Sequence, residues 1–188
     1  SDNNMKNSIA VLTLLLATSG LTVLLTNSST DAEEKMVVEF SRGTIDFGIV
    51  CSDVDKSVVF YKDVVGMKEI DGFDVPASLA ADAGLVDNHD LHVHVLVTQG
   101  SSNATRLKLM QIKEAPGRKV DHAFIHSSLG MSYSTIWVSD IDASLTRAAA
   151  GNVKPIAKGP VALPNGMFLA VIRDPDGNLV ELVGPKRK

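Results

Sequence analysis

Alternating and continuous apolar runs along the chain predict eight β-strands. Alternation of apolar and polar residues is typical of a strand with one buried face. The turn at residues 174–177 (DPDG) supports a hairpin between the last two runs, because proline opens such turns and glycine supplies a positive φ. The expected strands fall into two sets of four: residues 44–51, 67–73, 91–98 and 106–112, then 131–138, 153–156, 167–173 and 179–183.

One helix is predicted in each set of strands, and the two share a pattern. Residues 52–61 (SDVDKSVVFY) resemble residues 139–148 (SDIDASLTRA), and in both a serine–aspartate pair stands where a helix N-cap and an early acidic residue belong. Gly66 and Gly151 are expected to end the helices. The chain is therefore expected to contain two copies of one β-α-β-β-β unit. The apolar residues recur at helical spacing, at Val54, Val58, Tyr61 and Val65 in the first copy and at Ile141, Leu145 and Ala148 in the second.

The N-terminal region has a different pattern. Residues 7–30 carry no charge and contain two apolar runs, and Lys6 behind Met5 gives a short positive region ahead of them. We interpret residues 1–30 as an export signal, with residues 1–4 as an addition ahead of the natural start. A retained signal anchor is the alternative, because about 20 apolar residues suffice to span a bilayer.

This interpretation predicts an exported protein, located in a periplasm or secreted. Contact with a membrane is expected only through an uncleaved N-terminal segment. Residues 31–36 would then form a linker, and residues 37–185 the folded domain.

Composition narrows the classes of function. The 18 Lys and Arg residues against 22 Asp and Glu give a formal net charge of −4, so no nucleic-acid partner is expected. The chain has one cysteine, Cys51, which excludes an internal disulfide and a cysteine-rich zinc site. Any metal would need His, Asp and Glu ligands.

Two motifs at opposite ends of the domain carry a family resemblance. Residues 46–67 (DFGIVCSDVDKSVVFYKDVVGM) and residues 172–183 (IRDPDGNLVELV) resemble the opening and closing segments of the vicinal oxygen chelate superfamily. This superfamily includes glyoxalase I, extradiol dioxygenases and bleomycin-resistance proteins. The resemblance implies an α+β fold, in which two tandem β-α-β-β-β modules (about 40–113 and 131–185, joined by a linker) form an open eight-stranded barrel-like sheet. In that superfamily the concave face of the sheet holds a divalent metal.

The resemblance places the family's metal-ligand positions at Asp46, Lys108, Tyr133 and Glu181. Only Glu181 is a standard ligand there; Asp46 can ligate as a carboxylate, whereas Lys108 is a cation and Tyr133 is a poor ligand unless ionised. The standard metal site is therefore expected to be lost. Lys108 is expected between Asp46 and Glu181, where it would neutralise both carboxylates. A buried structural ion pair without a role in ligand binding is the alternative.

His92 and His94 suggest a different metal site. They alternate with apolar residues, so both leave the strand on one side. With Glu181 or Asp46 they would form a two-histidine, one-carboxylate site for Zn, Mn, Fe or Ni. The alternative is that they line a polar cavity wall or hydrogen-bond neighbouring strands.

Aromatic side chains and one histidine are also expected near the cavity. Tyr133 and Trp137 lie on the cavity side of one predicted strand, where they would form an apolar shelf for a flat small molecule or fill the barrel. His126, just ahead of that strand, is expected either to close over the cavity mouth or to lie in a solvated loop.

Two main classes of function remain. The first is a metal-free protein that binds a small organic molecule in a cavity lined by Asp46, His92, His94, Lys108, Tyr133, Trp137 and Glu181. The alternative is an enzyme, a glyoxalase-like lyase, an isomerase or a dioxygenase, that uses a relocated metal or an acid–base pair such as Glu181 with Lys108 or Tyr133. Glyoxalase I itself is disfavoured, because its standard ligands are missing and its glutathione-linked substrate is cytosolic. A structural, partner-binding domain is a third class, and the resemblance alone suggests a homodimer.

Overall fold

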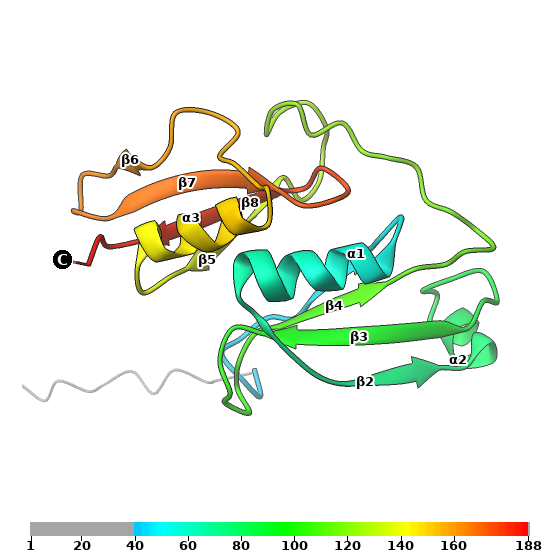
Figure 1. Cartoon of the computed structure of the whole chain (residues 1–188). Helices are drawn as coiled ribbons and strands as arrows, with labels where there is room; N and C mark the ends of the chain where they lie inside the picture. Colours follow the sequence, from blue (N-terminus) through cyan, green and yellow to red (C-terminus); the bar gives the residue numbers. More distant parts are fainter. Residues whose placement is uncertain (1–39, 188) are drawn as a thin grey trace, which may run out of the picture. The chain divides into compact units, whose positions relative to one another are not determined.

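The first copy of the repeat builds one four-stranded sheet in the computed structural model, which describes residues 40–187 (Figure 1). Its helix begins as α1 (Val54–Val59) and continues as the π-helix η1 (Phe60–Val65). β1 runs parallel to β4, and the other strand pairs are antiparallel. The strands are β1 (Phe47–Val50), β2 (Lys68–Val75), β3 (Leu91–Val97) and β4 (Arg106–Met110), in the spatial order β1-β4-β3-β2.

The second copy repeats this topology with one helix, α3 (Ile141–Ala150). β5 runs parallel to β8, and the sheet order β5-β8-β7-β6 corresponds strand by strand to that of the first sheet. The two sheets are not hydrogen-bonded to each other, so the eight strands form an open arrangement. This confirms the predicted α+β fold of two β-α-β-β-β modules. The strands are β5 (Tyr133–Trp137), β6 (Val161–Ala162), β7 (Phe168–Arg173) and β8 (Leu179–Gly184).

Two parts of the sequence prediction need correction. The strand expected at residues 153–156 is irregular, and the sheet gains only the two-residue β6 further along. Pro155 has no backbone N–H to donate and restricts the residue before it, so a regular ladder cannot form there. Second, a short helix that was not predicted, α2 (Ala77–Asp82), lies between β2 and β3.

The N-terminal predictions are not addressed by the fold. The expected export signal at residues 1–30 and linker at residues 31–36 lie outside the described residues. Within residues 40–187, no helix is long and apolar enough to cross a membrane.

Aspartate side chains begin both long helices. The carboxylate of Asp53 accepts a hydrogen bond from the backbone N–H of Lys56 at 3.1 Å, and Asp140 accepts from the N–H groups of Asp142 and Ala143. The aspartate of each serine–aspartate pair is therefore the N-cap, one residue later than the order of the pair predicted. Gly66, with φ at 89°, ends the first helix as predicted, because glycine adopts this left-handed conformation without steric cost.

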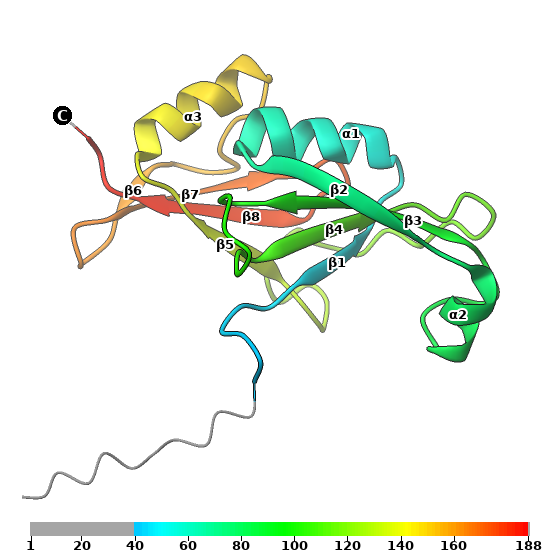
Figure 2. The same ribbon diagram turned by 90° about the horizontal axis from the view of Figure 1, so that it is seen from below.

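The two helices pack against each other on one side of the sheets (Figure 2). The guanidinium of Arg147, on α3, donates to the carbonyl oxygens of Val64 and Val65 at 3.1 and 2.6 Å. These carbonyls are at the end of η1, where a helix has no backbone donors of its own to satisfy them. Arg147 therefore caps the helix of the other module and joins the two copies.

A second connection between the modules is buried beneath the helices. The hydroxyl of Tyr61, on η1, donates to a carboxylate oxygen of Asp174 at 3.1 Å. Asp174 opens the turn between β7 and β8, and both side chains are almost completely buried. Burial and the neighbouring Asp174 raise the pKa of the Tyr61 hydroxyl, so that it remains the proton donor.

We expect Tyr61→Phe to lower the free energy of unfolding by about 1–2 kcal/mol, because it removes one hydrogen bond from a buried carboxylate. Urea denaturation at neutral pH measures the change. Tyr133→Phe is the matched control, since the ring of Tyr133 is half exposed and its hydroxyl has no hydrogen-bond partner among the described residues. The control should change the free energy of unfolding by less than about 0.5 kcal/mol. An equal loss in both variants would contradict a stabilising role for the Tyr61–Asp174 hydrogen bond.

Candidate functional site

The strand registers define two faces of each sheet. On β8, Val180 and Leu182 are fully buried in the core beneath the helices, and Glu181 between them points to the opposite side, which we call the open face. On β4, Leu107 and Leu109 are in the same core, so Lys108 is on the open face. Lys108 and Glu181, both expected in the cavity wall, therefore lie on the face of their sheets away from the helices.

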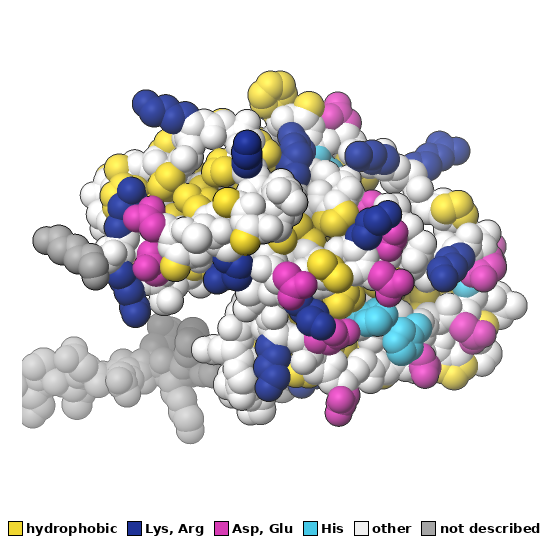
Figure 3. All heavy atoms as spheres, viewed as in Figure 1, with side chains coloured by type: hydrophobic (Ala, Val, Ile, Leu, Met, Phe, Trp, Pro, Cys, Tyr) yellow, Lys and Arg dark blue, Asp and Glu magenta, His cyan; other side chains and the backbone are white. Residues whose placement is uncertain are grey.

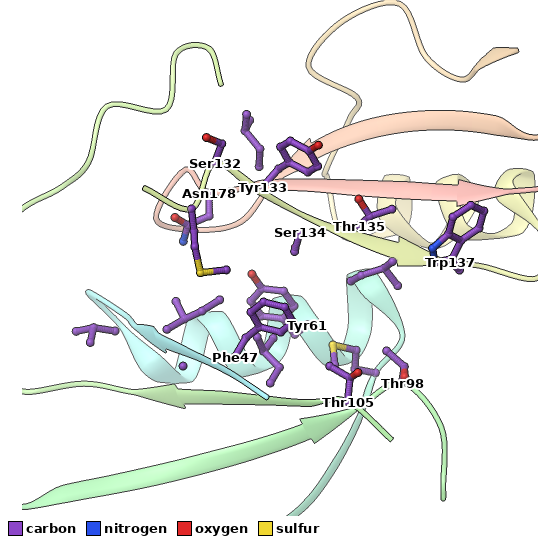
Figure 4. Close-up of a pocket in the computed structure, with 18 of the residues that line it drawn as sticks. Phe47, Tyr61, Thr98, Thr105, Ser132, Tyr133, Ser134, Thr135, Trp137 and Asn178 are labelled. Carbon is purple, nitrogen blue, oxygen red and sulfur yellow. The ribbon is translucent and has the colours of Figure 1, made fainter. Parts of the chain in front are cut away.

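A cavity of about 640 Å³ lies between the two modules. It is lined by every residue of β1 and of β5, which are edge strands, each paired on one side only. The cavity therefore follows the seam between the sheets rather than the centre of one concave face. Figure 4 shows Tyr133, Thr135 and Trp137 along β5 on one side, with Phe47 and Tyr61 on the other.

The wall of this seam cavity combines aromatic side chains with uncharged polar groups. Its apolar residues include four aromatic side chains and two methionines, of which Tyr61 is only 1% exposed. Among the described residues that line it there is no Asp, Glu, Lys, Arg or His. The hydroxyl and amide groups belong to Thr98, Gln99, Thr105, Ser132, Ser134, Thr135 and Asn178.

Of the seven residues predicted to bind a ligand, only Tyr133 and Trp137 line the seam cavity. Asp46 and Lys108 lie outside it and form an ion pair at 3.1 Å. Arg42, which sequence reasoning missed, also binds Asp46, at 2.9 Å. The Asp46 side chain is only 11% exposed, and among the described residues its Oδ1 has no hydrogen-bond partner.

The charge of Asp46 is stabilised by its two partners. Burial alone would raise the pKa of this carboxyl, but the hydrogen bonds and positive charges of Lys108 and Arg42 lower the pKa below its ordinary value of 3.8. Lys108 therefore neutralises one carboxylate, as predicted.

Glu181 does not share this ion pair, which corrects the expectation that Lys108 lies between two carboxylates. Its Oε2 accepts a hydrogen bond from the Thr135 hydroxyl at 2.7 Å, and within residues 40–187 no cationic side chain lies within 4.0 Å of it. The physical reason is the sheet order. Lys108 and Glu181 are on different sheets, and the two edge strands β1 and β5 lie between β4 and β8.

His92 and His94 are on the other face of the first sheet. Lys108 pairs with Val95 in the register, so His94 points to the helix side, where its Nδ1 lies 3.1 Å from Glu69. His92 Nδ1 lies 2.6 Å from Asp74. Figure 3 shows histidine side chains among acidic and basic ones on this face.

The relocated metal site is therefore not assembled from His92, His94 and Glu181. Among the described residues there is no group of three or more His, Cys, Asp or Glu side chains that could hold a metal ion. The two histidines instead interact with acidic side chains of the neighbouring strand β2, which was the alternative interpretation. The hydrogen bond with His94, together with Lys62, lowers the pKa of Glu69.

The unpredicted helix α2 explains why the side of the histidines was misjudged. Leu91, Val93 and Val95 form a small buried cluster with Ala80 of α2, on the open face of the first sheet. Since His92 and His94 were expected at the cavity, the apolar residues that alternate with them were expected on the opposite side of the strand. In the structure these apolar side chains lie on the open face with Ala80 of α2, so His92 and His94 point to the helix side instead.

A second cavity, of about 240 Å³, lies over the open face of the second sheet. Residues 123–126 cover it, and Glu181, Tyr133, Ile156, Val171 and Leu179 complete the wall. His126 lines this cavity and stacks on Phe124, with the ring centroids 5.6 Å apart. His126 is an exposed loop residue, as one of its two interpretations expected, and it also lines this second cavity; the apolar Phe124 and Ile125 were missed.

Comparison with known families settles the superfamily. The family model described as Glyoxalase/Bleomycin resistance protein/Dioxygenase superfamily matches residues 44–182. The chain belongs to this superfamily. Comparison with curated proteins gave no match.

Solved structures of this superfamily share the fold. A glyoxalase family protein from Bacillus cereus is 21% identical over 80% of this chain and 99% of its own, with a TM-score of 0.64. The trypanothione-dependent glyoxalase I of Leishmania major is 24% identical over 77% and 87%, with a TM-score of 0.55. An antibiotic-binding protein from a Streptomyces species is 21% identical over 76% and 95%, with a TM-score of 0.50.

We expect Lys108→Met to lower the free energy of unfolding by about 1–2 kcal/mol at pH 7, because it leaves Asp46 with Arg42 alone. Since the folded pKa of Asp46 is below 3.8, the stabilisation is present above that pH and is lost as the pH falls through the folded pKa. The difference in the free energy of unfolding between Lys108→Met and the wild type should therefore become smaller below pH 3.8. Urea denaturation at pH 7 and at pH values below 3.8 measures it.

Lys56→Met is the matched control for this prediction. Lys56 pairs with Asp53 at 2.7 Å, but its side chain is 75% exposed, so the pair contributes little. If Lys56→Met lowered the free energy of unfolding as much as Lys108→Met, a stabilising role for the Lys108–Asp46 ion pair would be contradicted.

Proposed function

We propose that this chain is an exported small-molecule-binding protein of the glyoxalase/bleomycin-resistance superfamily, with its ligand in the seam cavity between β1 and β5. The observation that carries the proposal is the wall of that cavity, which combines four aromatic side chains with uncharged hydrogen-bonding groups. Its volume of about 640 Å³ is within the range of small-molecule sites.

The wall chemistry supports a ligand with a flat aromatic body. Aromatic side chains favour offset or edge-to-face contacts with another ring, and hydroxyl and amide groups select its polar substituents. A ligand whose charge lay within the seam would lose its hydration without gaining a partner. The Streptomyces neighbour is named as an antibiotic-binding protein, and we propose a comparable binding role, rather than turnover, for this chain.

We further propose that the protein works without a metal. In support, Lys108, at a family ligand position, already neutralises Asp46, and a cation repels a metal ion at that place. The chemistry of the enzyme alternative has no equivalent support, since the histidine pair faces away from Glu181.

Metal analysis tests this point. We expect protein purified without a tag or chelator, and then incubated with zinc, manganese and ferrous iron, to retain well below one equivalent of metal by mass spectrometry. Near-stoichiometric metal that is lost in Glu181→Ala would contradict the metal-free proposal and favour an enzyme.

Ligand binding can be measured through Trp137, which is the chain's one tryptophan and lines the seam. We expect 2-naphthol, a flat uncharged probe, to change the emission of Trp137 saturably. Tyr133→Leu should weaken binding about tenfold, because one ring contact contributes up to about 1.5 kcal/mol.

Phe73→Leu is the matched control for Tyr133→Leu. Phe73 is 44% exposed, against 49% for Tyr133, but does not line the seam. Equal weakening by both variants, or emission that does not saturate, would count against the seam as the binding site.

Export and self-association complete the proposal. The uncharged, apolar residues 7–30 support export to a periplasm or the medium. Recovery of the full-length chain only from the cytoplasm of a bacterial host that expresses it would contradict export. Exposed apolar side chains outside both cavities, such as Leu85 and Leu129, support a homodimer, for which sedimentation equilibrium is the test.

A further inference from the structure

The carboxylate of Glu181 lies in the wall of an otherwise apolar cavity. The residues around it in the second cavity include Phe124, Ile125, Ile156 and Val171. Among the described residues its side chain accepts one hydrogen bond, on Oε2, from Thr135. Among the described residues no donor bonds Oε1, so the carboxylate can still accept a hydrogen bond from a ligand in this cavity.

The cations nearest in the fold are engaged elsewhere. Lys108 binds Asp46. Arg173, on β7, donates to the carbonyl oxygens of Gly177 and Ala123 at 2.8 and 3.3 Å, and so attaches the covering segment to the turn. His126 stacks on Phe124, and neither it nor Arg173 has a nitrogen within 4.0 Å of Glu181.

The remaining walls also favour positive charge. Phe124 and Tyr133 present aromatic rings to the cavity, and the face of such a ring attracts a cation. An organic ammonium group can donate hydrogen bonds to one carboxylate. A divalent metal needs more ligands than the described residues of this cavity supply.

The second cavity is continuous in its lining with the seam. Tyr133 and Leu179 line both cavities, and the Thr135 hydroxyl that lines the seam donates to Glu181. Figure 4 shows Tyr133 and Thr135 along β5 beside the seam. The two cavities are therefore neighbours across Tyr133 and Leu179, and a ligand that occupies both would pass a substituent beside Tyr133 to Glu181.

We propose that Glu181 and the aromatic walls of the second cavity form a subsite for a positively charged nitrogen of the ligand. The ligand class is then a cationic aromatic amine, held by an uncharged seam at one end and a carboxylate at the other. This inference rests on the proposed function, because it assumes that the seam holds the aromatic body.

Three matched probes test the subsite by isothermal titration calorimetry: 2-naphthylmethylamine, 2-naphthylmethanol and 2-naphthoate. The wild-type protein should bind the amine at least about tenfold more tightly than the alcohol, and the carboxylate most weakly. In Glu181→Gln the amine and the alcohol should bind within about threefold of each other. Glu114→Gln, an exposed change of equal charge outside both cavities, should leave the preference intact.

The outcomes separate the subsite from the proposed function. If the alcohol binds but the amine binds no better, or if the preference for the amine survives in Glu181→Gln, the subsite is wrong and the seam proposal stands. If none of the three probes binds, the seam proposal fails, and the subsite with it. Should Glu181→Gln not fold, the salt dependence of wild-type binding decides, because only the amine's affinity should fall as salt rises.

Discussion

The hydrogen bond between Tyr61 and Asp174 is the interaction on which the arrangement of the two modules depends. Asp174 accepts hydrogen bonds from the backbone N–H groups of Asp176 and Asn178 and from the Asn178 side chain, as well as from Tyr61. One buried carboxylate thus folds the turn between β7 and β8 and binds the helix of the other module. Because Tyr61 also lines the seam, the same contact sets a wall of the cavity.

The two modules share a topology but differ in what covers their open faces. On the first sheet Val93 and Val95 are buried in a small apolar cluster that includes Ala80 of α2. On the second sheet residues 123–126 leave a cavity above Glu181. A repeated unit therefore produces one covered face and one accessible face, and the difference arises in the connection between β2 and β3 and in the segment that joins the two modules.

Structural features that depend on neighbouring residues were predicted correctly from the sequence. Features that depend on contacts between distant segments were not. The serine–aspartate pairs, the glycine stops and the alternation on β8 depend on neighbouring residues, so they could be predicted from sequence. The Lys108–Asp46 pair also followed, since it joins strands that are adjacent in the sheet. The side of His92 and His94 did not, because it depends on α2, a short helix whose N-cap, Pro76, makes no side-chain hydrogen bond and so gives none of the usual start signals.

The π-helix makes the joint between the modules sensitive to chain length. A π-helical turn holds more residues than an α-helical turn of the same height, so η1 accommodates its residues at a different rotation about the axis. Removing one residue ahead of Tyr61 in this helix would rotate Tyr61 about the helix axis and away from Asp174, even if both residues were retained. Helix length, as well as residue identity, therefore decides which relatives can build the same seam.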